Sequence, residues 1–272
     1  MSDIHGCLGE LQLKMKYVDL SGDNLLILLG DYMDYGPESG QTLRYVYDLQ
    51  KKYGDQKIIC LKGNHEAMFL SWIDEYKTGK AQRRRGNGFT FNDWFRTDSD
   101  YGLPVFRTLV SEDQLKKFEK VASKASFEEI NHLAAEMICE TNEDIISWIR
   151  KLPKYYKTKT QIFVHAGVDE EAEDLWEYGS TEDIMLWKYP AETGNFCKTI
   201  IAGHVGTGSE SLANDKDFHD VFYDGASHYY IDGSVYRPGG KLLLLEYNTD
   251  TGKYRSIDDE GKADPIKRFW KE

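Results

Sequence analysis

The sequence predicts an α/β fold in which buried parallel strands alternate with helices, and in which a helical segment interrupts the middle of the chain. Residues 25–29 and 57–61 are short continuous apolar runs, and each ends close to a glycine followed by Asp or Asn. Runs of this length are typical of strands buried on both faces. Residues 111–150 instead carry apolar side chains at helical spacing. These observations favour βαβ units with a helical insertion.

The elements follow in order along the chain. Residues 39–53 have helical spacing, and a helix is expected from residue 64 to about 76. Ser111 is typical of a helix start and Pro153 of a helix stop, so an insertion or cap is expected at about residues 78–152. Strands are expected at 161–164, 198–202, 229–231 and 241–247, with a turn at 248–252 and a hairpin partner at 253–257. The 272 residues are expected to form one domain with this insertion.

Composition narrows the class of protein. The chain has 34 Lys+Arg against 46 Asp+Glu, a formal net charge of −12, which disfavours nucleic acid as a partner. No apolar run approaches the roughly 20 residues of a membrane span, and no signal-like stretch is seen. Four widely separated cysteines without a CxxC pair read as reduced thiols. A cytoplasmic protein without a membrane partner is expected.

The start of the chain is unusual. Asp3-Ile4-His5-Gly6 looks like the end of a strand, yet only two residues precede it, whereas a strand needs about five or six. The sequence therefore predicts either an unsupported first loop or a natural protein that begins several residues earlier with a central strand.

Metal-binding residue types recur where the apolar runs end. In an open α/β sheet, ligands collect beyond the carboxyl ends of the strands, so these segments are expected to converge if their strands are parallel neighbours. Carboxylates, imidazoles and an amide oxygen suit first-row divalent metals. Each short motif is weak alone, but the series is hard to dismiss. The residues are Asp3, His5, Asp31, Asp34, Asn64, His65, His165 and His204.

This series resembles the signature of the calcineurin-like metallophosphoesterases. The segments are Asp3–Gly6, Gly30–Asp34, Gly63–Glu66, His165–Gly167 and Gly203-His204. Their form is similar to the bacterial and phage type of serine/threonine phosphoprotein phosphatase, a branch that includes symmetrical dinucleoside-tetraphosphate hydrolases. The resemblance implies a four-layer α-β-β-α sandwich of two mixed sheets with the helical insertion.

The resemblance also implies a centre of two divalent metal ions, Mn²⁺ first, with iron, zinc or nickel as alternatives. Asp3, His5 and Asp31 would hold one metal, and Asp31 would bridge to a second completed by Asn64, His165 and His204. Two cations roughly 3.5–4 Å apart acidify a bridging water and clamp phosphoryl oxygens for in-line attack by hydroxide.

The resemblance further implies that His65 would protonate the leaving alkoxide. Asp34 would orient the His65 imidazole and stabilise its positive charge. The two residues form the expected catalytic pair.

Two positions depart from the family pattern. Tyr35 and Tyr189 stand where the family usually has phosphate-binding arginines, with Lys188 beside the second. Neither tyrosine nor lysine replaces an arginine fork directly. Three explanations of the missing arginines are open. A basic side chain from another segment could fold over the site, the two tyrosines could donate hydrogen bonds to a different kind of substrate, or the protein could have lost its catalytic activity. The candidate substrate-binding residues are Tyr35, Asn87, Lys188, Tyr189 and the basic run Arg83, Arg84 and Arg85, whose simpler interpretation is a solvated loop.

The leading hypothesis is therefore a dinuclear-metal phosphomonoesterase resembling serine/threonine phosphatases, with a phosphoprotein or a small phosphoester or nucleotide as substrate. The first alternative is a phosphoanhydride hydrolase acting on dinucleoside polyphosphates. The second is a noncatalytic metal-binding interaction protein, which the lost arginines favour and the retained Asp34 and His65 oppose.

Overall fold

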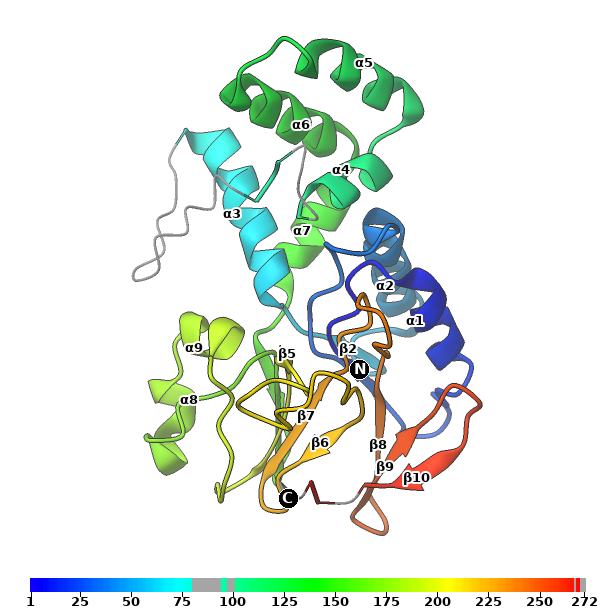
Figure 1. The fold of residues 1–272 in the computed structure, drawn as a ribbon, viewed down its shortest axis with the longest axis vertical. Helices are drawn as coiled ribbons and strands as arrows, with labels where there is room; N and C mark the ends of the chain where they lie inside the picture. Colours follow the sequence, from blue (N-terminus) through cyan, green and yellow to red (C-terminus); the bar gives the residue numbers. More distant parts are fainter. Residues whose placement is uncertain (80–93, 97–100, 267, 270–272) are drawn as a thin grey trace.

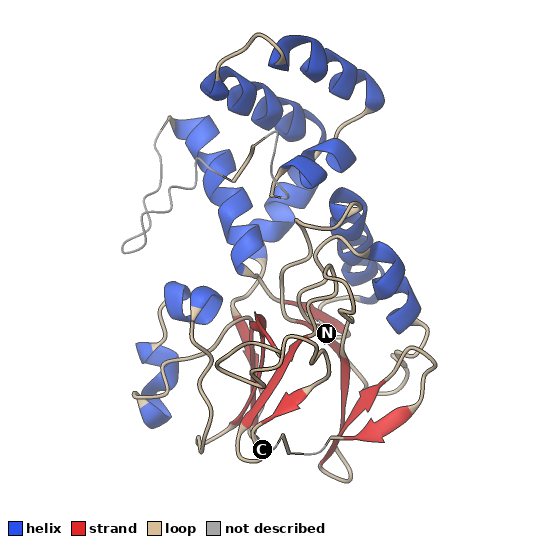
Figure 2. Ribbon diagram, in the orientation of Figure 1, coloured by secondary structure: helices blue, strands red, loops and turns tan. Residues whose placement is uncertain are grey.

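The computed structural model describes residues 1–79, 94–96, 101–266, 268 and 269. Figures 1 and 2 show two parts, with strands and their covering helices below and a group of helices above. The α/β fold class predicted from the sequence is confirmed. Among the described residues, no helix is long and apolar enough to cross a membrane.

The helices fall into those that cover the sheets and those that form the upper group. The covering helices are α1 (Leu8–Met15), α2 (Ser39–Tyr53), α8 (Trp176–Gly179) and α9 (Glu182–Trp187), with a 3₁₀ turn at Glu173–Leu175. The upper helices are α3 (Asn64–Thr78), α4 (Leu103–Leu109), α5 (Glu112–Ala122), α6 (Phe127–Thr141) and α7 (Glu143–Lys151).

The strands form three hydrogen-bonded sheets. Strands β1 (Leu26–Leu28) and β2 (Ile58–Cys60) make a parallel pair. Strands β8 (Leu244–Asn248), β9 (Lys253–Ile257) and β10 (Ala263–Pro265) make an antiparallel sheet. The third sheet has the order β3-β4-β5-β7-β6 and is mixed; its strands are β3 (Tyr155–Lys157), β4 (Gln161–Val164), β5 (Thr199–Gly206), β6 (Phe222–Tyr223) and β7 (His228–Asp232).

Side-chain alternation along the strands divides the core. In β5, Ile200 packs on the outer side with Trp176 and Met185 of the flanking helices, whereas Ile201 packs between the sheets with Ile231. Successive strand residues point to opposite faces, so an apolar run can supply both clusters. A larger cluster joins β1 and β2 to α1, α2 and the upper helices.

The upper helices follow the sequence pattern closely. Ser111 caps α5 by accepting a hydrogen bond from the Gln114 N–H, as predicted for a helix start. Phe95, Phe106 and Phe118 are buried against one another at centroid distances of 4.5–6.1 Å. Core packing therefore explains their apolar character.

The division of the strands differs from the two mixed sheets expected. A cleft of about 590 Å³, lined by Leu26, Leu244 and Tyr254 among others, separates the β1–β2 pair from β8. Residues 1–3 lie beside β1: the Met1 amino group donates to Ile27 O at 3.1 Å, and Asp3 N donates to Gly30 O at 3.1 Å. Residues 1–3 are not part of a strand, so in the described residues no strand joins β1 to β8.

Candidate functional site

The predicted ligands come from three loops, the start of one helix and one strand. Asp31 follows β1, Asn64 opens α3 after β2, and His165 follows β4. His204 lies within β5, where the pairing with β7 shifts register. Convergence was predicted on the condition that the strands are parallel neighbours. Strands β1 and β2 are parallel neighbours and so are β4 and β5, but the two pairs belong to different sheets. The segments converge because these sheets pack against each other.

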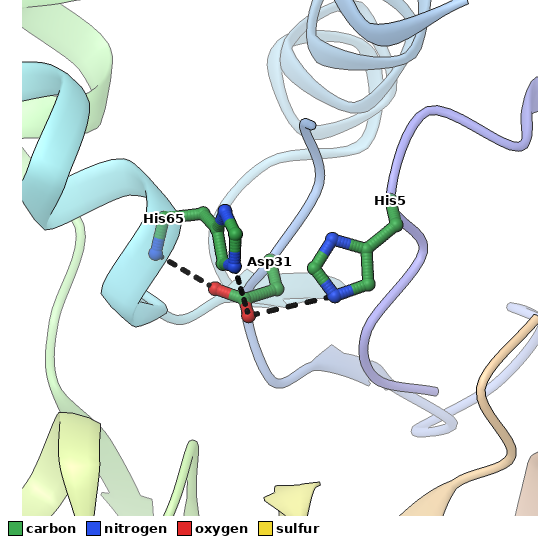
Figure 3. Close-up of side chains that lie close together, drawn as sticks. All are labelled: His5, Asp31 and His65. Carbon is green, nitrogen blue, oxygen red and sulfur yellow. Dashed lines mark hydrogen bonds and ion pairs between the residues drawn. The ribbon is translucent and has the colours of Figure 1, made fainter. Parts of the chain in front are cut away.

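The first group of donors surrounds the Asp31 carboxylate (Figure 3). Asp31 Oδ2 is 3.7 Å from His5 Nε2, which is itself 3.9 Å from Asp3 Oδ1. Asp31 Oδ2 also lies 3.8 Å from His65 Nε2. Ligand atoms of His5, Asp31 and His65 lie within 4.8 Å of one another. This spacing could hold a metal ion.

The second group shares the same Asp31 carboxylate. Asp31 Oδ2 is 3.4 Å from His165 Nε2. Asn64 Oδ1 lies 2.7 Å from His165 Nε2 and 3.1 Å from His204 Nδ1. Ligand atoms of Asp31, His165 and His204 also lie within 4.8 Å of one another. Asp31 therefore stands between two groups of donors, where a bridging ligand would stand.

Backbone carbonyls fix the orientation of two imidazoles. His5 Nδ1 is 2.9 Å from Met33 O, and His165 Nδ1 is 3.0 Å from Leu29 O. A carbonyl can only accept, so each Nδ1 carries the proton and each neutral ring directs the Nε2 lone pair toward Asp31. Metal-ligating histidines are commonly oriented in this way. The donor set therefore fits divalent cations.

The electrostatics of this cluster also favour a bound cation. Burial raises the pKa of Asp3 and Asp31 well above the usual range, and neighbouring carboxylates, including Asp232 and Glu66, raise it further. Burial lowers the pKa of His165 well below its usual value, and the neighbouring imidazoles add to this. Divalent cations would keep these carboxylates ionised and use the neutral imidazole as a ligand.

The Asp34 carboxylate is held by three donors. Asp34 Oδ2 is 2.7 Å from His65 Nδ1 and accepts a hydrogen bond from Trp94 Nε1 at 2.8 Å. Asp34 Oδ1 accepts from the Gly102 N–H at 2.7 Å. Asp34 is fully buried, so the pair is shielded from bulk water. Two of the donors come from the segment between α3 and α4, which therefore contributes directly to the site.

Most of these side chains sit on unusual backbone. Asp3, His5, Asp31, Asp34 and His204 all have φ between +45° and +70°. This left-handed conformation is unfavourable for residues other than glycine, and it persists only where surrounding contacts hold the backbone in place. Such strained positions gather at functional sites, and here they coincide with the predicted site residues.

Sequence reasoning missed the supporting role of Glu66. Its buried carboxylate accepts hydrogen bonds from the N–H groups of Asp31, Tyr32 and Gly63, each at 2.9 Å. It thereby ties the loop after β1 to the start of α3. The signal was present, because Glu66 is the N3 residue of a capping box at Gly63.

Sequence reasoning also missed an aromatic cluster beside the metal donors. The ring of Tyr236 stacks on Tyr35 at 4.1 Å and lies 5.1 Å from the His5 ring. Tyr101 stacks on His65 at 5.5 Å, and its hydroxyl is 2.6 Å from that of Tyr35. No local motif marks Tyr101 or Tyr236, so only the fold brings them here.

The candidate substrate-binding residues have different surroundings. Tyr35 lies in the aromatic cluster, and Tyr189 is 69% exposed. The Lys188 ammonium binds Glu170 and Glu192 at 3.0 and 2.7 Å, so its charge is already neutralised. Arg83, Arg84, Arg85 and Asn87 lie outside the described residues.

Curated relatives match part of the chain. A symmetrical bis(5'-nucleosyl)-tetraphosphatase of Pseudomonas syringae pv. syringae is 35% identical over 72 residues, 26% of this chain and 23% of that protein. A Caenorhabditis elegans protein named among the serine/threonine-protein phosphatases is 31% identical over 94 residues, 34% of this chain and 20% of that protein. The chain thus spans about a quarter or less of the length of these relatives.

Solved structures match the fold over nearly the whole chain. A structure titled as a cold-active protein tyrosine phosphatase has a TM-score of 0.58 at 16% identity, covering 98% of this chain and 78% of that one. The cold-active protein-tyrosine phosphatase of a psychrophilic Shewanella species gives 0.54 at 15% identity, covering 98% and 79%. At this identity the likeness concerns the fold alone. The model of the calcineurin-like phosphoesterases matches residues 1–208, three quarters of the sequence, and the chain therefore belongs to the calcineurin-like phosphoesterase family.

Proposed function

We propose that this protein is a metal-dependent phosphoester hydrolase that acts on phosphomonoesters. The observation that carries the proposal is the buried Asp34–His65 pair, whose imidazole itself lies among the donors around Asp31. When bound, divalent metals would supply an activated water and would neutralise phosphate charge. Asp3, His5, Asp31, Asn64, His165 and His204 would hold them, with Mn²⁺ as the first candidate.

The chain's own residues would handle the proton. Because Asp34 lies 2.7 Å from His65 Nδ1, it holds the protonated ring through that nitrogen. His65 Nε2 then faces the metal donors and can give its proton to the leaving oxygen. Trp94 and the Gly102 N–H fix Asp34, so the pair is set in position before substrate arrives.

The second candidate function is hydrolysis of dinucleoside polyphosphates, which the names of the Pseudomonas relatives favour. The acid pair favours the first candidate. An alkoxide, such as that of a serine side chain, is a poor leaving group and needs a proton, whereas the phosphate leaving group of an anhydride needs one much less. A buried acid that Asp34 holds through Nδ1 is therefore most useful on a phosphomonoester.

The test compares His65→Asn with the native protein on a phosphoserine peptide and on a dinucleoside tetraphosphate, with manganese loaded and metal content measured. We expect the native protein to favour the peptide, and kcat on the peptide to fall by about 10²–10⁴-fold in the variant. The exposed His132→Asn is the matched control. Turnover of the tetraphosphate alone would support the second candidate, and no turnover of either substrate would contradict both.

A further inference from the structure

The proposed function requires a cation for the substrate phosphate, and neither tyrosine at the altered family positions supplies one. The Tyr35 hydroxyl is 2.6 Å from that of Tyr101, and its ring is covered by Tyr236. Tyr35 is therefore occupied by its aromatic neighbours. A phosphomonoester dianion still needs hydrogen-bond donors that carry positive charge.

The lysines near the site do not meet this need. The Lys188 ammonium is shared between Glu170 and Glu192 and also donates to Val168 O at 2.5 Å. Lys62 is buried, with only 8% of its surface exposed, so it presents little of its side chain to a substrate.

Arg237 is the described cation that remains next to the site. It belongs to the β7–β8 loop, drawn in orange in Figure 1, which rises above the sheets. Its Nε donates to the Tyr236 hydroxyl at 3.2 Å, and its guanidinium lies 5.5 Å from the centre of the Tyr236 ring. That ring is 5.1 Å from the ring of His5. A single aromatic side chain thus separates the guanidinium from a predicted metal ligand.

The guanidinium is also available. It is exposed, and among the described residues it forms no ion pair and uses neither terminal nitrogen in a hydrogen bond. The loop itself is closed by backbone hydrogen bonds, from Arg237 N to Ser234 O at 2.8 Å and from Lys241 N to Gly233 O at 3.0 Å. A loop closed by backbone hydrogen bonds therefore presents, beside the cluster, a guanidinium that forms no ion pair with the described residues.

We propose that Arg237 binds the substrate phosphate and supplies the positive charge that Tyr35 and Tyr189 do not. The inference rests on the proposed function. Two terminal N–H groups of a guanidinium match two phosphate oxygens, which makes arginine the suitable residue for this task. Tyr236 is a positioning residue, because it holds Nε, and among the described residues neither terminal nitrogen is used in a hydrogen bond.

The test measures binding of inorganic phosphate to the manganese-loaded protein by calorimetry, together with kcat and KM on a phosphoserine peptide. In Arg237→Ala we expect the phosphate dissociation constant and KM to rise by about 10- to 100-fold, with manganese affinity unchanged. Arg237→Lys should recover part of the loss, since lysine keeps the charge and not the fork. Arg255→Ala, which removes an arginine paired with Glu246 on β9, is the control.

The outcomes separate this inference from the proposed function. A phosphate dissociation constant and KM within about twofold of the native values in Arg237→Ala would overturn it, as would a native protein that binds metal but no phosphate. If the native protein hydrolyses no phosphoester yet binds phosphate in an Arg237-dependent way, the proposed function fails and the assignment of Arg237 holds.

Discussion

Glu66→Gln is the sharpest test of how the site is held together. Oε2 of Glu66 accepts from the N–H groups of Asp31 and Gly63, and Oε1 accepts from that of Tyr32. Glutamine has one oxygen, so it can replace Oε2 only by turning its amide NH₂ toward the Tyr32 N–H. One buried donor then loses its acceptor, and the other two bonds lose their charge assistance.

The magnitude follows from these bonds. A buried donor left without an acceptor costs about 1–3 kcal/mol, and a hydrogen bond to a charged group contributes about 1.5–3 kcal/mol against about 1 for a neutral one. We therefore expect Glu66→Gln to lower the free energy of unfolding by about 3 kcal/mol. Because the bond to Asp31 also fixes the candidate bridging ligand, metal affinity should fall by about 10- to 100-fold.

Urea denaturation and metal titration by calorimetry measure the two effects. Glu119→Gln removes an exposed carboxylate in the middle of α5 and serves as the control. Burial raises the pKa of Glu66, and its three N–H donors oppose this. If the carboxyl were protonated, glutamine would be a near-isostere. An unfolding free energy within about 0.5 kcal/mol of the native protein, with metal affinity within about threefold, would refute the reasoning.

Two further predictions concern other parts of the structure. His228 is buried between Asp224 and Glu170; burial alone would lower its pKa, but the hydrogen bonds and charges of the two carboxylates together outweigh this and raise the pKa to about 9. The protonated imidazole stabilises the folded state fully below the ordinary pKa of 6.5, and this stabilisation disappears as pH rises through 9. In urea denaturation, His228→Gln should therefore lower the free energy of unfolding by about 2–3 kcal/mol at pH 7 and by almost nothing at pH 10. The control His132→Gln should leave the free energy of unfolding unchanged at both pH values. Gly63→Ala would place a Cβ 2.1 Å from Asp31 Oδ1, so metal binding measured by titration should be lost while the helical circular dichroism remains, and unchanged metal affinity would contradict the close approach.

The sequence was most informative where function depends on residues next to an element boundary. Asp31, Asn64 and His165 each follow a strand that was predicted within about one residue, so their convergence could be anticipated from strand direction. The hydrogen-bond partners of Asp34 could not be predicted from the sequence. Trp94 and Gly102 lie 60 and 68 residues away from it, and no periodicity predicts which distant donors a buried carboxylate will find.

Charge is harder to predict than position, and the basic residues show why. Lys188 has the sequence context of a phosphate-binding residue, but Glu170 and Glu192 cancel its charge. Arg237 has no motif around it, yet its guanidinium lies beside Tyr236 and forms no ion pair with any residue that the structure describes. A cationic side chain can bind an anionic ligand only if no carboxylate of the protein already neutralises it. Tertiary contacts decide whether such a carboxylate lies nearby. A family position that has lost its arginine therefore says little about activity until the cations on neighbouring loops have been examined.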